Sequence, residues 1–330
     1  MDDKIKVAVV GVGFFGERHA RVYSELPDVQ LVTVVDSDIQ RAREMAERFG
    51  CEAASDITSL FGRINAASIA TPTADHVKMA IPLLNAGVDL LIEKPITATL
   101  SEADEIIQLA EQKGRVVQVG HIERYNPALL RLREYPLAPR VMECHRMGPF
   151  VERAANVSVV LDLMIHDIDI VLSLTASYIT KVEAVGLSVV SPEIDIAHAR
   201  LHFADGLVAN LMASRVSEEQ VRTLKIFQDQ GYFFLNYATR ELVATAPPRG
   251  AAGDPRTYIA EGRKQSLRLS TQKYSFEQGD ALKMELCAFL EAATGPTRTT
   301  SGPDRVGASA ADAKAALAVA LKIIDAIRAR

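Results

Sequence analysis

The chain has 330 residues, 48% of them apolar and 24% charged, with a formal net charge of −5 at neutral pH. This acidic balance argues against a nucleic-acid-binding protein, because such proteins carry a basic face. No apolar run approaches the ~18 residues that cross a bilayer, and the first residues, MDDKIKV, lack the pattern of a secretion signal, so we expect a cytoplasmic protein without a membrane partner.

The first predicted strand, KIKVAVV, leads into a G-x-G-x-x-G motif at Gly11, Gly13 and Gly16, which opens a predicted helix. In that context one glycine allows a tight turn, one lets the backbone approach a pyrophosphate, and one lets helix and strand touch. The helix N-terminus would face the phosphates with its N–H groups and the positive end of its dipole. The motif therefore predicts a dinucleotide site at this turn, to which we also assign the intervening Phe14 and Phe15.

A second strand, VQLVTVVD, ends at Asp36, which comes 20 residues after Gly16. An acidic side chain at that distance is placed to bind the adenosine ribose, and Ser37 follows it. Since a carboxylate repels a 2′-phosphate, Asp36 favours NAD over NADP. Arg41 is near enough in the sequence that NADP stays open as the less favoured cofactor.

Strands and helices then alternate, which is typical of a parallel sheet with helices on both faces. We expect helices at 38–49, 74–86 and 101–113 and strands at 65–71, 88–93 and 115–121. Ser101 and Asp104 have the spacing of a capping box at the start of the third of these helices. In doubly wound sheets ligands bind beyond the carboxyl ends of the strands, so the residues that follow each strand are candidates for the site.

Two of the turns after these strands carry candidate cofactor residues. ATPTADH supplies Thr71, Pro72 and His76, and the last of these is expected to cap or brace the cofactor loop. EKP supplies Glu93 and Lys94, with a proline that fixes the turn. A lysine at the end of an apolar strand is expected to point toward the cofactor cleft, and the alternative is an ordinary surface lysine on a loop.

Beyond the last of these strands the pattern changes to alternating runs, with turn signals at 204–206 and 229–231 that predict hairpins. The expected fold class is α/β: a doubly wound parallel sheet of Rossmann type in residues 1–123, and an α/β domain with a large open, mostly antiparallel sheet in residues 124–330. A loop without periodicity at 246–263 and helices at about 280–293 and 308–329 complete the second domain.

The run VLDLMIHDID has the apolar character of a buried helix, yet it contains three carboxylates and a histidine. In a helix Asp162 and His166 share a face, and Asp169 follows one turn later on the same side. One interpretation is a buried histidine that an aspartate holds for structural reasons. The other is a polar face that lines a cleft.

Three residues just past the last strand of the first domain, Arg124, Tyr125 and Asn126, are candidates for holding a sugar or a nicotinamide. Helix capping by Asn126 and packing by Tyr125 are the alternatives. His19 and His121 have no partner that the sequence identifies, so we expect structural roles for them. The three cysteines show no metal-ligand spacing, and we expect no metal.

GVGFFGERHA, ATPTADH, EKP and the D-x-x-x-H pair of Asp162 and His166 together resemble the Gfo/Idh/MocA family of nicotinamide-dependent sugar and cyclitol oxidoreductases, over the whole chain. The resemblance implies a Rossmann domain joined to an α/β domain whose open sheet commonly forms a dimer interface, and hence a homodimer or homotetramer. It also implies that Lys94 and His166 lie beside the nicotinamide. The stretches GHIERYNPA and SVVLDLMIHDIDIVLSL are similar to the branch that oxidises carbon 3 of UDP-N-acetylglucosamine, a step toward 3-amino sugars of lipid A or surface polysaccharide.

The activity implied by this resemblance is oxidation of a sugar hydroxyl, in which the nicotinamide takes a hydride and a base takes the hydroxyl proton. Lys94 and His166 both qualify as the base, and Asp162 would orient the imidazole and stabilise its charged form. For a nucleotide sugar we assign the diphosphate to Arg146 and Arg153, because arginine binds phosphate bidentately. Two alternatives stay open: a dehydrogenase of a free sugar or cyclitol, and a cofactor-sensing regulator without catalysis.

Overall fold

A computed structural model of the chain describes residues 4–152, 155–247, 257–258, 267–277, 279–295 and 306–329. The chain divides into two compact units: Met1–Tyr125 with Asp280–Leu317, and Asn126–Gly279 with Ala318–Arg330. Most of the loop expected at 246–263 lies outside the described residues. Within them, no helix has both the length and the apolar character needed to span a bilayer.

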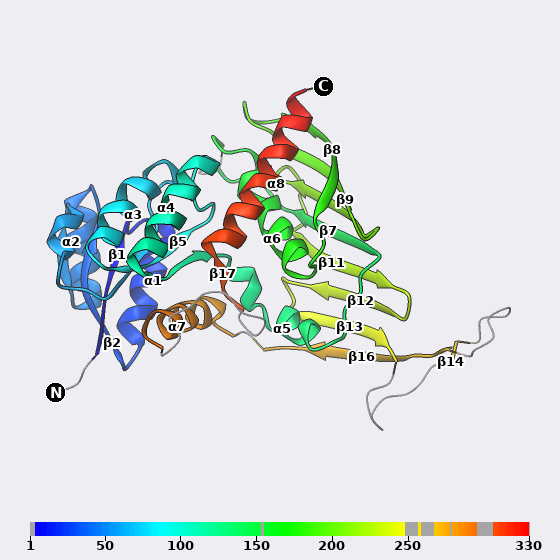
Figure 1. Ribbon diagram of the computed structural model, residues 1–330, viewed down its shortest axis with the longest axis horizontal. Coiled ribbons are helices and arrows are strands. Elements are labelled where there is room, and N and C mark those ends of the chain that lie inside the picture. The colour runs from blue at the N-terminus through cyan, green and yellow to red at the C-terminus, as the bar shows by residue number, and fades with distance from the viewer. Residues whose placement is uncertain are drawn as a thin grey trace. The chain divides into compact units, whose positions relative to one another are not determined.

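The first unit alternates strands and helices, as predicted (Figure 1). Its elements are β1 (Ile5–Val10), α1 (Phe14–Glu25), β2 (Val29–Val35), α2 (Ile39–Phe49), β3 (Glu52–Ala54), η1 (Ile57–Leu60), β4 (Ala66–Ile69), η2 (Thr73–Asp75), α3 (His76–Asn85), β5 (Asp89–Glu93), α4 (Leu100–Lys113), β6 (Val117–Gly120), η3 (Ile122–Tyr125), α7 (Ala281–Thr294), β17 (Ala308–Ser309) and the start of α8 (Ala310–Arg328). The helices and strands predicted between residues 38 and 121 are all present, with ends within two residues of the predicted ones.

The sheet of this unit has the order β17-β6-β5-β4-β1-β2-β3. All neighbouring strands are parallel except β17, which pairs antiparallel with β6. The order β3-β2-β1-β4-β5-β6 is that of a Rossmann sheet, in which ligands bind where the order reverses, between β1 and β4. The predicted doubly wound parallel sheet is confirmed, and the expected cofactor site would lie at its switch point.

The predicted capping box of α4 is wrong in its residues. The helix begins at Leu100, one residue earlier than expected, and the reciprocal bonds are made by Thr99 and Glu102 instead of Ser101 and Asp104. Thr99 has an extended backbone and precedes the helix, so its side chain can accept from the N–H of Glu102, whereas Ser101 already lies within the first turn.

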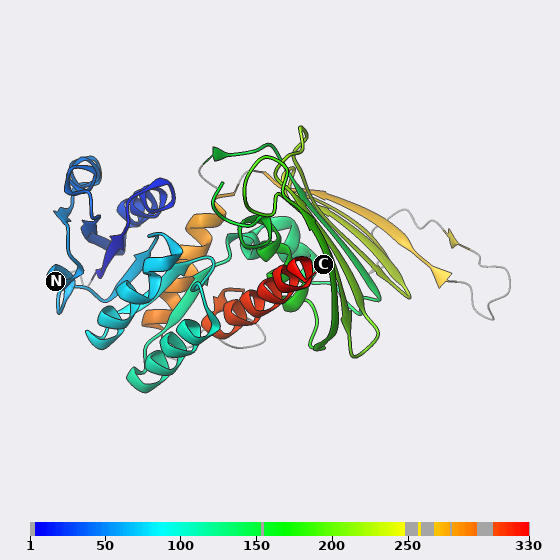
Figure 2. The same cartoon turned by 90° about the horizontal axis from the view of Figure 1, so that it is seen from above.

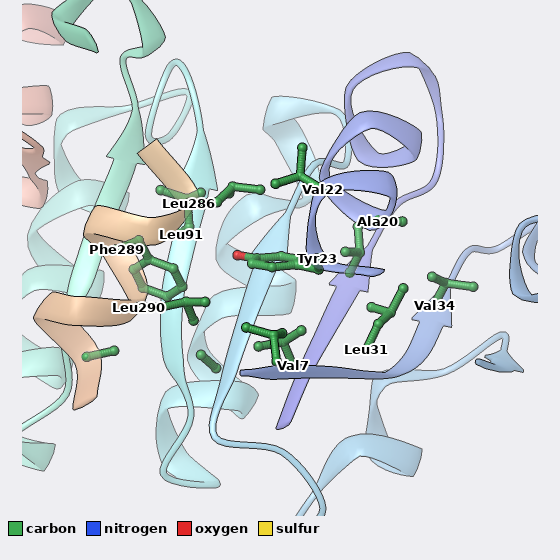
Figure 3. Close-up of a cluster of buried hydrophobic side chains, with 14 of the residues drawn as sticks. Val7, Ala20, Val22, Tyr23, Leu31, Val34, Leu91, Leu286, Phe289 and Leu290 are labelled. Atoms are coloured by element: carbon green, nitrogen blue, oxygen red, sulfur yellow. The ribbon is translucent and has the colours of Figure 1, made fainter. Parts of the chain in front are cut away.

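Helix α7 completes the core of the first unit, although it follows the whole second sheet in the chain. Figure 3 shows Leu286, Phe289 and Leu290 of α7 packed in one cluster with Tyr23 of α1. The Tyr23 hydroxyl hydrogen-bonds to Ser68 at 2.9 Å. Burying a leucine or phenylalanine side chain contributes roughly 1.5–3 kcal/mol, so this helix stabilises the first unit substantially. The two units therefore differ from the expected division, which assigned every residue after 123 to the second domain.

The second unit is built on an eight-stranded sheet with the order β16-β13-β12-β11-β7-β10-β9-β8. Its elements are α5 (Pro127–Arg133), β7 (Val141–Met147), the π-helical turn η5 (Val160–Met164), α6 (Ile165–Ser173), β8 (Ile179–Leu187), β9 (Ile196–Phe203), β10 (Val208–Ser214), β11 (Val221–Gln228), β12 (Gly231–Asn236), β13 (Glu241–Ala246), β14 (Thr257–Tyr258), β15 (Leu267–Arg268) and β16 (Ser270–Ser275), with the end of α8.

Only β7 and β10 are parallel neighbours in this sheet, and every other pair is antiparallel. The two predicted hairpins are confirmed: β9 pairs with β10, and β11 pairs with β12. Helix α5 contacts β12 and β13, and α6 contacts β7 and β10. Figure 2 shows both helices on the same side of the sheet. The fold class expected for this half of the chain is therefore confirmed.

Candidate active site

The turn between β1 and α1 contains three glycines with different surroundings. Gly11 has φ +84°, and a Cβ there would lie 2.8 Å from the backbone nitrogen of Thr71, so the turns after β1 and β4 pack backbone against backbone. A Cβ at Gly16 would lie 1.7 Å from the carbonyl oxygen of Gly11, whereas one at Gly13 would have no described neighbour within 4 Å. The fold requires the first and last glycines, and the middle one leaves space that a ligand can fill.

Helix α1 begins directly after this open glycine. Gly13 is its N-cap residue, and no side chain in the described part of the chain caps it. The N–H groups of the first turn can therefore bind a phosphate, which the helix dipole also favours. Phe14 and Phe15 occupy this first turn and are 49% and 44% exposed. The guanidinium of Arg18 lies 3.9 Å from the centre of the Phe14 ring.

Asp36 closes the same turn from the end of β2. Its Oδ2 accepts from the Val12 N–H at 2.9 Å, and its Oδ1 accepts from the Asp38 N–H at 2.9 Å. A carboxylate has about four acceptor positions, so both oxygens can still accept from ribose hydroxyls. Arg41 Nη1 lies 3.5 Å from Asp36 Oδ1, and its side chain is 49% exposed. Ser37, the other residue assigned to this position, is exposed.

The turn after β4 contains a buried hydroxyl group that a bound dinucleotide could engage. Thr71 Oγ1 is buried and has no hydrogen-bond partner in the described part of the chain, and Pro72 beside it is exposed. Such an orphaned hydroxyl is expected where a ligand supplies the missing partner. His76 braces this turn, as predicted: Nε2 lies 3.0 Å from the Thr71 carbonyl oxygen, and the ring is 1% exposed.

The turn after β5 holds a hydrogen-bonded pair beside Lys94. His19 Nε2 of α1 donates to Glu93 Oε1 at 3.0 Å, and Lys94 itself is half-buried. Burial raises the pKa of Glu93, but the hydrogen bond and charge of His19 and the charge of Lys94 outweigh it and lower this pKa below its ordinary value. The sequence analysis missed the His19 partner, although the residue lies on the buried face of α1 three positions after Gly16.

In the second unit the predicted polar run forms the π-helical turn η5 and the start of α6. The N–H of Ile165 donates to the Val160 carbonyl, five residues earlier, and such wide turns are frequent at functional sites. Asp162 and His166 are both partly exposed. Asp169, expected on their face, is 1% exposed.

The two arginines assigned to a diphosphate have different outcomes. Arg146 is 3% exposed and forms a bidentate pair with Asp167 of α6, with Nε–Oδ2 and Nη2–Oδ1 distances of 2.9 Å each. It also lies over the Tyr237 ring, 5.3 Å from its centre. These contacts hold α6 on the sheet, one residue from His166. Arg153 lies outside the described residues.

Arg124, Tyr125 and Asn126 are all buried, with 5%, 3% and 7% of their surface exposed. Arg124 Nη1 donates to the Gly307 carbonyl at 3.3 Å. Asn126 caps α5 by accepting from the Ala128 N–H at 3.1 Å, which is the capping role considered from the sequence. The hydrogen bonds of these two residues support the fold, and their assignment to a substrate stays a prediction.

One buried network near the polar run had no signal in the sequence. Asp195 is fully buried and accepts from the backbone N–H groups of Val189 and Val190 and from Arg215 Nε. Burial raises the pKa of Asp195, but these donors outweigh it and lower this pKa well below its ordinary value. Arg215 also donates to the Val157 carbonyl at 2.6 Å, which fixes the chain just before η5.

Comparisons with known proteins agree with this architecture. Residues 5–121 match a family model described as an oxidoreductase family with an NAD-binding Rossmann fold, and residues 131–234 match the GFO/IDH/MocA C-terminal domain. The chain is 38% identical over 239 residues to UDP-N-acetylglucosamine 3-dehydrogenase of Acidithiobacillus ferrooxidans, covering 72% of this chain and 76% of that protein. It is 26% identical to the scyllo-inositol 2-dehydrogenase (NAD(+)) of Bacillus subtilis, covering 77% and 80%. A solved structure of the Acidithiobacillus enzyme superposes with a TM-score of 0.86 at 32% identity, covering 99% of this chain and 98% of that one.

Proposed function

The chain belongs to the Gfo/Idh/MocA family of NAD(P)-dependent dehydrogenases acting on CH–OH groups, and from this premise we propose that it oxidises carbon 3 of UDP-N-acetylglucosamine to the 3-keto sugar, with NAD as the hydride acceptor. The product would serve the biosynthesis of 3-amino sugars. The observation that carries this substrate is the similarity to one UDP-N-acetylglucosamine 3-dehydrogenase in both sequence and fold, over 72% and 99% of the chain respectively.

The proposed cofactor site is the carboxyl edge of the first sheet. The N–H groups at the start of α1 would bind the diphosphate in the space beside Gly13. Asp36 would accept from the adenosine ribose, and its negative charge favours NAD over a 2′-phosphorylated cofactor. The Thr71 hydroxyl, for which the described residues supply no hydrogen-bond partner, would complete the site. When bound, the nicotinamide accepts the hydride that leaves carbon 3.

The proton of the C3 hydroxyl has to leave as the hydride departs, so that the carbon–oxygen bond becomes a ketone. Lys94 and His166 are the proposed acceptors, and both side chains are partly exposed within their own units. Asp162, four positions before His166 across the π-helical turn, would orient the imidazole and stabilise its charged form.

Turnover with a substrate panel tests this proposal. The enzyme is incubated with NAD and UDP-N-acetylglucosamine, other UDP-hexosamines, glucose and inositol, while NADH formation and product mass are recorded. Lys94→Ala and His166→Asn should each lose most of the turnover. Lys78→Ala is the matched control, because Lys78 is an exposed lysine of the same unit that pairs only with Asp75 in the described structure. A response to inositol with none to any UDP-sugar would overturn the proposed substrate.

A free cyclitol is the second candidate substrate, favoured by the 26% identity to a scyllo-inositol dehydrogenase over 77% of the chain. The same panel decides between the two. We also propose that the protein is cytoplasmic and forms a homodimer or homotetramer. Light scattering of the purified protein measures the size of the oligomer.

A further inference from the structure

We propose that His19 and His76 are positioning residues that hold Lys94 from both sides and couple it to the two turns of the cofactor site. This inference rests on the proposed function in one respect, the role of Lys94 in proton removal. Both histidines are buried within the first unit, with 1% of their surface exposed.

On one side of Lys94, His19 holds the preceding residue. It lies on α1, the helix that begins at the open glycine, and its Nε2 donates to Glu93 Oε1 at 3.0 Å. The Glu93 carboxylate lies close over Gly120, where a Cβ would come within 2.9 Å of the same oxygen. A charge-assisted bond in a buried position is strong, so a shift of α1 is transmitted to the backbone that enters Lys94.

On the other side of Lys94, His76 holds the two residues that follow. Its Nδ1 lies 3.1 Å from the carbonyl oxygens of both Pro95 and Ile96. Its Nε2 lies 3.0 Å from the carbonyl oxygen of Thr71, whose own hydroxyl has no partner in the described part of the chain. The ring therefore lies between the turn after β4, where a dinucleotide would bind, and the backbone that leaves Lys94, and it contacts both.

These two contacts fix the backbone on either side of a side chain that is itself flexible. A lysine side chain has four rotatable bonds, so its amine reaches a defined position only if its Cα is held. Both histidines are attached to elements that a dinucleotide would contact, α1 and the Thr71 turn. Cofactor binding should therefore order the segment 93–97. Without either imidazole ring, cofactor binding should no longer order this segment.

Amide hydrogen exchange of peptides that cover residues 93–97, measured with and without NADH, tests the coupling directly. In the native protein NADH should slow exchange in this segment. His19→Leu removes the donor to Glu93 and should abolish most of that slowing, whereas His19→Gln keeps a donor and should restore it. If His19→Leu shows the native response to NADH, the proposal is overturned. If His19→Leu does not fold, the two His76 variants still decide, because each retains a hydrogen-bonding side chain and they are expected to differ in turnover.

The two amide replacements of His76 separate its two contacts. Asparagine places a donor near the former Nδ1 and can still bond to Pro95, while glutamine places one near the former Nε2 and can still bond to Thr71. If the role of the ring is to position Lys94, His76→Asn should keep more turnover than His76→Gln. A misplacement of about 1 Å can cost roughly 100-fold in rate, so kcat should fall by up to that factor in His76→Gln while the NADH dissociation constant changes little. Equal kcat in the two variants would refute the assignment.

The outcome is distinguishable from failure of the proposed function. If no sugar is oxidised by the native protein, the substrate proposal fails, but exchange in residues 93–97 still reports whether NADH binding reaches Lys94 through the histidines. If sugars are oxidised and the exchange response persists in His19→Leu, the function stands and the positioning role falls.

Discussion

Replacing single glycines in the turn after β1 separates the demands of the fold from those of the cofactor. A Cβ at Gly13 meets no described atom within 4 Å, and the residue has φ −70°, which any residue adopts. Gly13→Ala should therefore change the free energy of unfolding by less than about 1 kcal/mol. A Cβ at Gly16 lies 1.7 Å from a backbone oxygen of Gly11, which cannot rotate away.

The two replacements should affect different properties, one the affinity for NADH and the other the stability of the fold. In Gly13→Ala the methyl group occupies space intended for the diphosphate, and overpacking of roughly 1–3 kcal/mol raises the NADH dissociation constant about 5- to 150-fold. In Gly16→Ala the backbone itself must move, so we expect a loss of about 3 kcal/mol or more, which lowers the melting temperature by roughly 6–12 °C in a unit of this size.

NADH fluorescence and circular dichroism measure the two effects independently. The chain contains no tryptophan, so titration of NADH fluorescence has no competing indole emission. If Gly13→Ala binds NADH as tightly as the native protein, the diphosphate does not lie where we propose. If Gly16→Ala melts at the native temperature, the packing argument for this glycine is refuted.

Three further predictions concern single carboxylates and their partners. Arg146→Met leaves Asp167 buried without its partner and should cost about 3–5 kcal/mol, most of which the double change with Asp167→Leu should restore; additive losses in urea unfolding would contradict the ion pair. Asp36→Ser removes the charge that repels a 2′-phosphate, so the preference for NADH over NADPH should fall roughly tenfold or more in binding titrations, and an unchanged ratio would argue against the ribose contact. Because the pKa of Asp195 is lowered on folding, its carboxylate contributes stability above an unfolded value of about 3.9, and this contribution is lost as pH falls through the folded value. Asp195→Asn should accordingly melt at a lower temperature than the native protein near neutral pH, and it should lose less stability on acidification. Melting temperatures of both proteins, measured from neutral to acidic pH, test this expectation.

The fold around the proposed cofactor site was predictable because its signals are local. The glycine motif, the strand that ends at Asp36 and the turn that carries Lys94 are each read from a short stretch of sequence. The alternation of strands and helices then orders them along one edge of a sheet. The pairing of His19 with Glu93 spans 74 residues, so no periodic pattern records it.

Residues with long-range partners were the ones whose surroundings the sequence did not reveal. Arginine suits a diphosphate and a buried carboxylate equally well, and only the fold brings Asp167 within reach of Arg146. The same holds for Asn126: its cap of α5 is local, but only the fold shows that its Nδ2 also donates to the Tyr237 carbonyl at 3.1 Å. The π-helical turn before His166 is likewise invisible, because α- and π-helical turns share the same apolar spacing over so short a run.

The return of α7 and β17 to the first unit has a consequence for biogenesis. When the ribosome has made the first 125 residues, the apolar surface around Tyr23 that α7 later covers is still open to solvent. The N-terminal segment of the first unit therefore stays incompletely folded while the entire second sheet is synthesised. A translation product that stops before Asp280 should need chaperones to avoid aggregation.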